Sequence, residues 1–231
     1  MPSYPQGLYV PPPDATELIV VRHGSSAAAV PGEPFELIEG QSNPPLSAEG
    51  EMQAGAVAAR LAREPVAALY ISTLDRTAQT AAPLTALTGL EPVIEPDLRE
   101  VHVGELEGGR FRIAFAERDP VIVRLLAEQR WDVIPGAESS AALAARVRGA
   151  AERIAAAVGP GAAAVLVTHG GVIGELCRQA TGSEPFAFLR VDNASITRIV
   201  VEADGRWLLR SYNDTTHLEG AAADPPSRPP R

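Results

Sequence analysis

Short apolar runs alternate with longer helical patterns along this chain, and this alternation limits the folds that the chain can adopt. A strand followed by a helix and then by another strand is the unit from which parallel sheets are built. The pattern therefore predicts an α/β protein, a three-layer α/β/α sandwich with a mostly parallel central sheet and helices on both faces. Strands are predicted over 18–21, 67–71, 92–94 and 163–168, and a hairpin over 195–201 and 206–212.

Helix signals fill the intervals between these strands. Ser47 is a predicted N-cap, with Glu49 and Glu51 in the first turn, where the helix dipole favours acidic side chains. A polar, helix-like segment at 110–130 lies within a stretch of about 105–135 that we expect to form a small helical cap insertion. The other predicted helices cover 47–61, 76–88, 139–158 and 172–181.

Proline-rich ends flank a single predicted domain. Residues 1–14 and the tail 221–231 are rich in proline, so both are expected to be disordered. The stretch between them, 15–220, contains no low-complexity linker and no internal repeat, which favours one domain.

Charge and cysteine content exclude several classes of function. A net charge of −9 argues against nucleic acid or an anionic membrane as the partner. The chain shows neither a signal peptide nor an apolar run of membrane-spanning length, so a cytoplasmic protein is expected. All 20 basic residues are arginine, which removes lysine-based chemistry. The single cysteine, Cys177, permits no intramolecular disulfide and is expected to lie in the core.

Four segments place polar side chains directly after an apolar run. In an open parallel sheet, ligands bind in the crevice outside the carboxyl ends of the strands, so these side chains are expected to meet at one edge. The convergence joins segments that lie far apart in sequence. The segments carry Arg22 and His23, then Ser72 and Arg76, then Arg99 and Glu100, and finally His169.

The collected set contains two arginines, two histidines and a carboxylate, which together fit phosphoryl transfer. Guanidinium groups match the oxygens of a phosphate and neutralise its charge. Arginines near a histidine also disfavour its protonation and keep the imidazole nucleophilic. A carboxyl group can supply the proton that a leaving alcohol needs. The set therefore predicts metal-free phosphoryl transfer through histidine, with no cofactor.

The motifs in this order resemble those of the histidine phosphatase superfamily, also called the phosphoglycerate mutase-like family, and of its phosphatase branch. The resemblance covers about residues 18–218. It rests on "RHG", "STLDRTAQTA", "DLREVHVGELEG", "PGAESSAALAARV", "VLVTHGGVI", "VDNASITRIVV" and "YNDTTHL".

The resemblance implies a role for each matching residue. His23 would be the nucleophile that forms a phosphohistidine, with its ring oriented by the carbonyl of Gly24 or a neighbour. Arg22, Arg76 and His169 would form the phosphate pocket. Glu100 would protonate the leaving group and then activate water, with the nearby carboxylates of Glu95, Asp97, Glu105 and Glu107 as the alternatives to it. The implied partner is a small phosphate ester, and a homodimer stays open.

One departure from the family pattern follows the nucleophile. Family members commonly carry an asparagine six places beyond this histidine, and here that place is Ala29. Loss of one such donor costs about 1–3 kcal/mol. Ser25 or Ser26 could replace part of the lost contact and bind substrate, and a different path of the loop 31–40 is the alternative.

Three functions follow from these observations. The first is a phosphomonoesterase, and the second is a phosphoglycerate mutase that uses the same residues. The 69 residues from Glu100 to His169 resemble the compact phosphatases. The third is a phosphate-ester-binding protein of low turnover, which the missing asparagine motivates.

Several other polar residues have a structural interpretation. Ser72 is expected to cap the following helix, Asn43 to shape a turn, and His102 to lie at the rim of the site. His217 and Asn213 are expected to hold the last strand in place. The arginines of the cap are interpreted as a solvated face from which one or two reach substrate. These are Arg110, Arg112, Arg118, Arg124 and Arg130.

Overall fold

We describe a computed structural model of the chain that covers residues 3–4, 6–7 and 9–219. The predicted disordered tail 221–231, and residues 1, 2, 5 and 8 of the predicted N-terminal tail, lie outside the described residues. No helix in the described ranges combines the length and the apolar character needed to cross a membrane.

The central sheet contains six strands, and four neighbouring strands run parallel. The order across the sheet is β5-β4-β6-β1-β7-β8. β7 is antiparallel to β1 and to β8, while β5, β4, β6 and β1 are parallel, so the predicted mostly parallel sheet is confirmed. The strands are β1 (Thr16–Arg22), β4 (Ala68–Ile71), β5 (Pro92–Ile94), β6 (Ala163–Thr168), β7 (Ile196–Val201) and β8 (Trp207–Asp214).

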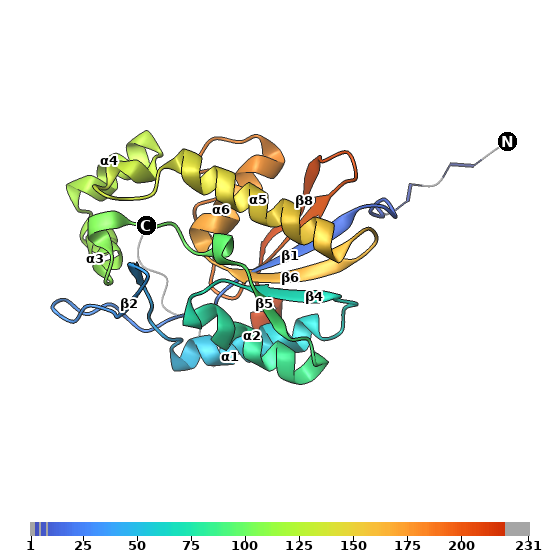
Figure 1. Ribbon diagram of the computed structural model, residues 1–231, viewed down its shortest axis with the longest axis horizontal. Helices are drawn as coiled ribbons and strands as arrows, with labels where there is room; N and C mark the ends of the chain where they lie inside the picture. Colours follow the sequence, from blue (N-terminus) through green and yellow to red (C-terminus); the bar gives the residue numbers. More distant parts are fainter. Residues whose placement is uncertain (1–2, 5, 8, 220–231) are drawn as a thin grey trace.

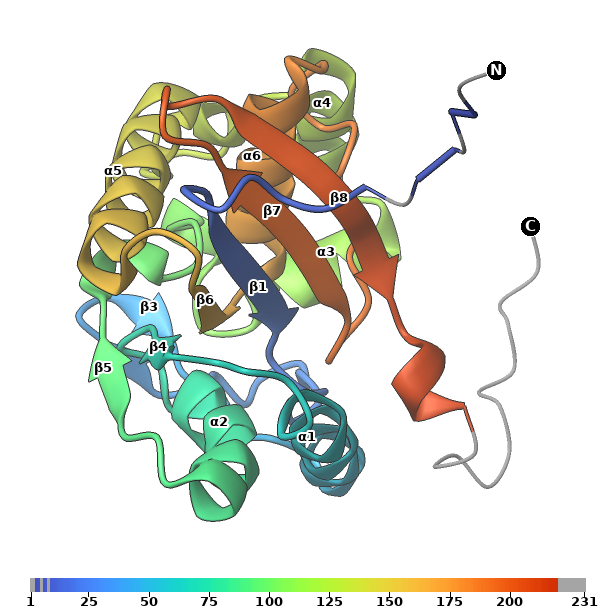
Figure 2. The same ribbon diagram turned by 90° about the vertical axis from the view of Figure 1, so that its right-hand side faces the viewer.

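Helices cover both faces of this sheet (Figures 1 and 2). Successive side chains of a strand point to opposite faces. In β1, Leu18 and Val20 accordingly pack with α5 and α6, whereas Ile19 and Val21 pack with α1 and α2. The predicted three-layer sandwich is confirmed. Its main helices are α1 (Ala48–Leu61), α2 (Asp75–Thr88), α5 (Ser140–Val158) and α6 (Gly170–Thr181).

The predicted caps and core positions are also present. The Ser47 side chain accepts a hydrogen bond from the N–H of Gly50 and begins α1, as expected. Cys177 is fully buried in the core on α6, and burial raises the pKa of its thiol to about 12. α2 starts one residue before the prediction and α6 starts at Gly170, two residues before it.

The segment 110–130 is helical, as expected, and it contains two helices separated by a break that was not predicted. α3 (Arg110–Glu117) ends at Arg118, which adopts a left-handed backbone with φ of 55°. The Asp119 side chain then caps α4 (Pro120–Glu128) by accepting from the N–H of Val121 at 2.8 Å. Proline at the first position of α4 favours a new helix start over continuation of the old one.

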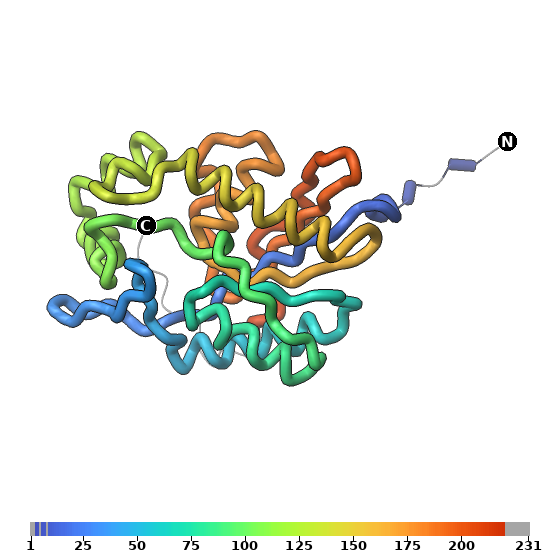
Figure 3. The backbone as a smooth tube through the Cα atoms, viewed as in Figure 1, coloured from blue at the N-terminus to red at the C-terminus, as the bar shows by residue number. Residues whose placement is uncertain are grey.

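The cap helices and a small hairpin lie at one end of the sheet. α3, α4 and the hairpin of β2 (Leu37–Ile38) and β3 (Gln41–Ser42) form that end in Figures 1 and 3. β1 and β6 end there, so the residues that follow these strands face the cap. Short 3-10 helices complete the connections: η1 (Pro96–Leu98), η2 (Gly104–Leu106), η3 (Trp131–Val133) and η4 (Thr216–Leu218).

Candidate active site

His23 follows β1 and is held in a defined orientation. Its backbone N–H donates to the carbonyl of Thr168 at 2.9 Å, and the ring atom Nδ1 lies 2.7 Å from the carbonyl oxygen of Gly24. A carbonyl can only accept, so this contact places the ring proton on Nδ1 and leaves the lone pair on Nε2. The side chain at position 24 must be absent, because a Cβ there would lie 2.5 Å from the carbonyl oxygen of Gly50.

His169 follows β6 and contacts the same site. Its ring centroid lies 5.2 Å from that of His23, with the two planes inclined at 61°. The Nε2 atom lies 2.8 Å from the hydroxyl oxygen of Ser72, while the buried Nδ1 atom has no hydrogen-bond partner. Ser72 also accepts from the N–H of Leu74 at 3.2 Å. Ser72, which was expected to cap α2, instead orients this histidine, because Leu74 occupies the N-cap position of α2 and that helix has no side-chain cap.

Burial and positive neighbours keep both histidines neutral. Burial first, then the positive charges of Arg76 and Arg22, lower the pKa of His23 well below its usual value of about 6.5. Burial and the charge of Arg76 lower the pKa of His169 in the same direction. A neutral imidazole is the form that can attack phosphorus.

This shift leads to a pH prediction. The lowered pKa means that His23 stays neutral as the pH falls through 6.5, where an ordinary histidine becomes half protonated. The ring resonances of His23 and His169 should therefore stay unshifted from about pH 8 to about pH 6 in an NMR titration. In the unfolded chain both rings take up protons in that range, so the free energy of unfolding should decrease as the pH falls. A resonance of His23 that titrates near 6.5 would contradict the assignment.

Two arginines lie beside His23 with donors unused by the protein. Arg76 donates from Nη1 to the carbonyl of Ser42 at 2.9 Å, and Arg22 donates from Nη1 to the carbonyl of Val191. The buried Nε atom of each has no hydrogen-bond partner. Burial lowers the pKa of Arg76 to about 10, which leaves the guanidinium charged at neutral pH. Buried, charged donors without partners are suited to bind an anion.

Glu100 is fixed by the start of α6. Its carboxylate accepts from the N–H of Gly171 at 3.1 and 3.3 Å, and from the N–H of Val101 at 2.9 Å. A Cβ at position 171 would lie 2.6 Å from Oε1 of Glu100, so the glycine there allows this carboxylate to approach the backbone N–H closely. The carboxylate predicted to transfer protons is thus tied to the element that follows His169.

A cavity of about 210 Å³ brings the main candidates together. Arg22, His23, Arg76 and Glu100 all line it, whereas His169 is fully buried against His23 and is not among the lining residues. Gln41 of β3 extends this wall and donates to the carbonyl of Glu100 at 2.6 Å. Aromatic side chains close the remaining sides, namely Phe35, Phe111 and Trp131.

Ser25 and Ser26, which were expected to bind substrate, do not line this cavity. The N–H of Ser25 donates to the side chain of Gln53 at 2.8 Å, which ties the loop to α1. The hydroxyl of Ser26 accepts from Nη2 of Arg112 at 2.6 Å. The loop after His23 therefore holds Arg112 of α3 at the cavity, and the two serines of the loop do not line it.

Arg112 is one of the five cap arginines from which one or two were expected to reach substrate, and of these five it is the one that lines the cavity. It lines the cavity with Arg22 and Arg76, and its Nη1 donates to the carbonyl of Ala27 at 2.8 Å. Two left-handed glycines, 108 and 109, precede α3 and turn the chain so that this helix starts beside the loop after His23. This glycine pair is the sequence feature from which the position of Arg112 could have been inferred.

Other polar residues stabilise the walls as expected. Asn43 accepts from the N–H of Asp75 at 3.0 Å and so holds the turn before α2. His217 contacts the carbonyl of Ala194 at 2.9 Å, and Asn213 accepts from the N–H of Asp192 at 2.7 Å.

Glu107, one of the nearby carboxylates weighed against Glu100, also lines the cavity. It is buried and accepts from the N–H of Val103 at 3.0 Å and from the N–H of Ser42 at 2.8 Å.

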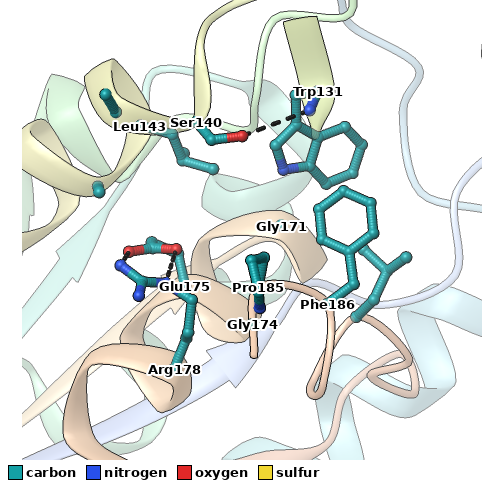
Figure 4. A pocket seen from close by; sticks show the side chains of 12 residues that line it. Trp131, Ser140, Leu143, Gly171, Gly174, Glu175, Arg178, Pro185 and Phe186 are labelled. Atoms are coloured by element: carbon teal, nitrogen blue, oxygen red, sulfur yellow. Dashed lines mark hydrogen bonds and ion pairs between the residues drawn. The ribbon is translucent and has the colours of Figure 1, made fainter. Parts of the chain in front are cut away.

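A second cavity, of about 220 Å³, is lined by residues of α5 and α6 that include Gly171 (Figure 4). Its walls are largely apolar, and Trp131 and Phe186 form one side. Glu175 and Arg178 pair there at 2.7 Å and neutralise each other. This cavity offers no free cation to a phosphate.

Comparison with known proteins gives consistent matches over most of the chain. The model of the histidine phosphatase superfamily (branch 1) matches residues 18–215. A metal-independent phosphoserine phosphatase of Arabidopsis thaliana is 36% identical over 89% of this chain and 84% of that protein. A probable phosphoglycerate mutase GpmB of Yersinia enterocolitica is 33% identical over 90% of this chain and 97% of that protein. A mycobacterial glucosyl-3-phosphoglycerate phosphatase superposes with a TM-score of 0.70 at 28% identity, over 87% of this chain and all of that one.

Proposed function

We propose that this chain, which belongs to the histidine phosphatase superfamily, is a metal-independent phosphomonoesterase. Its relatives include a phosphatase and a probable mutase. It would hydrolyse a small phosphorylated metabolite through a phosphohistidine on His23. The observation that carries this proposal is the cavity itself. A neutral, oriented imidazole lies there with two unpaired arginine donors and a fixed carboxyl group.

The first step transfers the phosphoryl group to the enzyme. Nε2 of His23 attacks phosphorus while the bond from phosphorus to the ester oxygen breaks. Glu100 donates its proton to that oxygen, so the product leaves as a neutral alcohol. Arg22 and Arg76 neutralise the phosphoryl oxygens, and the Nδ1 side of His169, free of protein partners, offers a further donor. The Gly24 carbonyl stabilises the charge that develops on the His23 ring.

The second step returns the enzyme to its starting state. The Glu100 carboxylate, now ionised, takes a proton from water, and the resulting hydroxide attacks phosphorus. The bond between phosphorus and Nε2 breaks, inorganic phosphate leaves, and Glu100 is protonated again. One carboxyl group thus serves both steps.

The walls of the cavity favour the phosphatase over the mutase. A mutase must hold a second, strongly anionic phosphate ester against the phosphohistidine. Beyond Arg22 and Arg76, Arg112 is the one further cation among the described residues that line this cavity, and Glu107 adds a second carboxylate that would repel an additional anionic ester. An assay that compares phosphate release with conversion of 2- to 3-phosphoglycerate separates these two functions.

The position of Arg112 favours an active enzyme over the third function, a phosphate-ester-binding protein of low turnover. Its guanidinium group can supply the donor that the alanine at position 29 lacks. We expect Arg112→Ala to lower kcat/KM about 10- to 100-fold, because one charge-assisted contact to the phosphate is lost. Added guanidinium ion should restore part of the activity, which loss of a purely structural contact would not allow.

Arg124→Ala is the matched control for this variant. Arg124 lies on the neighbouring cap helix α4 and pairs with Glu128 at 2.9 Å, away from the cavity. We expect kcat/KM to stay within about twofold of the parent value, since an exposed ion pair contributes little. Equal losses in both variants would remove Arg112 from the site.

The proposed function is tested by phosphate release from a panel of phosphorylated metabolites with and without EDTA. We expect release from at least one ester and the same rate after chelation. Release that stops on chelation and returns with a divalent metal would overturn the metal-independent mechanism.

A further inference from the structure

A larger cleft opens from the reacting centre toward the cap. It has a volume of about 450 Å³ and shares Arg22, Glu100, Phe111, Arg112 and Trp131 with the cavity described above. We refer to it as the outer cleft. Its apolar wall consists of Phe111, Phe115, Leu126, Trp131, Leu189 and Val191.

Two large apolar side chains of this wall remain exposed to solvent. Phe115 on α3 is 41% exposed, and Leu126 on α4 is 40% exposed. They belong to different helices, yet both face the outer cleft. Covering such surface is favourable by about 25 cal/mol for each Å² removed from water. A ligand with an apolar body would gain this free energy.

The outer cleft offers little to a leaving group rich in hydroxyls. Among its described lining residues, none carries a hydroxyl or side-chain amide, and the polar groups are Glu100 and three arginines. A sugar or polyol that lies against the apolar wall of Phe115 and Leu126 would lose hydrogen bonds to water, and the charged side chains of the cleft, Glu100 and three arginines, are the partners left to it. An aromatic or branched aliphatic group forms no hydrogen bonds to water and therefore loses none when it enters the cleft.

The position of Glu100 connects this cleft to the chemistry. The proton donor of the proposed mechanism must touch the ester oxygen, and everything bonded beyond that oxygen belongs to the leaving group. Glu100 lies at the junction between the phosphate cavity and the outer cleft. The leaving alcohol therefore extends from Glu100 toward Phe115 and Leu126.

From this arrangement, and resting on the proposed phosphatase function, we propose that the outer cleft selects phosphate monoesters of alcohols that carry an aromatic or similarly bulky apolar group. The apolar group packs against Phe115 and Leu126, and the phosphate occupies the arginine-lined cavity.

The test compares two esters of matched intrinsic reactivity, 2-phenylethyl phosphate and ethyl phosphate, with glycerol 3-phosphate as the polar ester. Both primary alcohols leave with similar difficulty, so a difference in kcat/KM reports binding of the phenyl group. We expect 2-phenylethyl phosphate to exceed ethyl phosphate by at least tenfold. Equal values for the three esters would overturn the inference while leaving the phosphatase intact. Absence of phosphate release from any ester would instead contradict the proposed function.

Substitutions in the apolar wall test which side chains produce the preference for 2-phenylethyl phosphate. Phe115→Ala and Leu126→Ala should each reduce the ratio of the two kcat/KM values about five- to tenfold. Since both side chains are substantially exposed, each variant should keep the parent circular dichroism spectrum. Leu87→Ala is the control, because Leu87 is 61% exposed on α2 and absent from both cavities. It should leave the ratio unchanged.

A second copy of the chain is the competing occupant of this apolar wall. Size-exclusion chromatography at the assay concentration distinguishes the two. A Phe115→Ala variant that changes from dimer to monomer and retains the full ester preference would assign the wall to an interface and overturn the inference.

Discussion

His23→Ala is expected to abolish phosphate release, with a loss of at least about 10⁴-fold in kcat. The variant removes the proposed nucleophile, which is the one histidine among the described residues that line the cavity. The other ring of the pair, His169, has its Nε2 engaged with Ser72. Measurement of phosphate release under saturating substrate tests this expectation.

A measurement of phosphate binding to His23→Ala distinguishes loss of the nucleophile from loss of the phosphate site. Arg22 and Arg76 remain in the variant, so calorimetry should still detect inorganic phosphate binding within about tenfold of the parent affinity. His217→Gln is the matched histidine control, because His217 contacts the Ala194 carbonyl outside the cavity. Full activity in His23→Ala would refute covalent catalysis at this residue.

Glu100→Gln is expected to reduce kcat about 10²- to 10⁴-fold for an alkyl phosphate. The amide keeps the size of the side chain but cannot donate a proton to the leaving oxygen or accept one from water. An activated ester such as p-nitrophenyl phosphate needs no proton on its leaving group. Its first step should therefore proceed, while the second step stalls for lack of a base.

Rapid mixing makes this division visible. We expect Glu100→Gln to release a burst of about one equivalent of p-nitrophenol, followed by slow turnover. Glu105→Gln, a change at a carboxylate of the same segment that does not line the cavity, should show parent behaviour. Equal losses on alkyl and activated esters, with no burst, would remove Glu100 from proton transfer.

The layered fold could be predicted because strand and helix periods are local properties. Leu18 to Val21 and the run 163–168 read as buried strands from composition alone, and both lie at the centre of the sheet. The break between α3 and α4 was missed although Pro120 marks it. The polar pattern over the whole segment suggested one period, whereas a single residue, Arg118, reverses the backbone.

The candidate site could be predicted to the extent that its residues follow strands. Arg22, His23 and His169 each come directly after a strand that the sequence identifies, so topology alone brings them together. Arg112 follows no strand. Its position depends on the turn at 108–109 and on a loop path held by Gln53, and such long-range contacts leave little trace in local sequence.

The central claim is that His23 carries the phosphoryl group during turnover. Rapid acid-free quenching of the Glu100→Gln variant with a ³²P-labelled ester tests it most directly, because the slow second step should let the phosphoenzyme accumulate. We expect label that survives base, is lost in acid and maps to the peptide containing His23. Label on a serine, or steady turnover with His23 unlabelled, would contradict it.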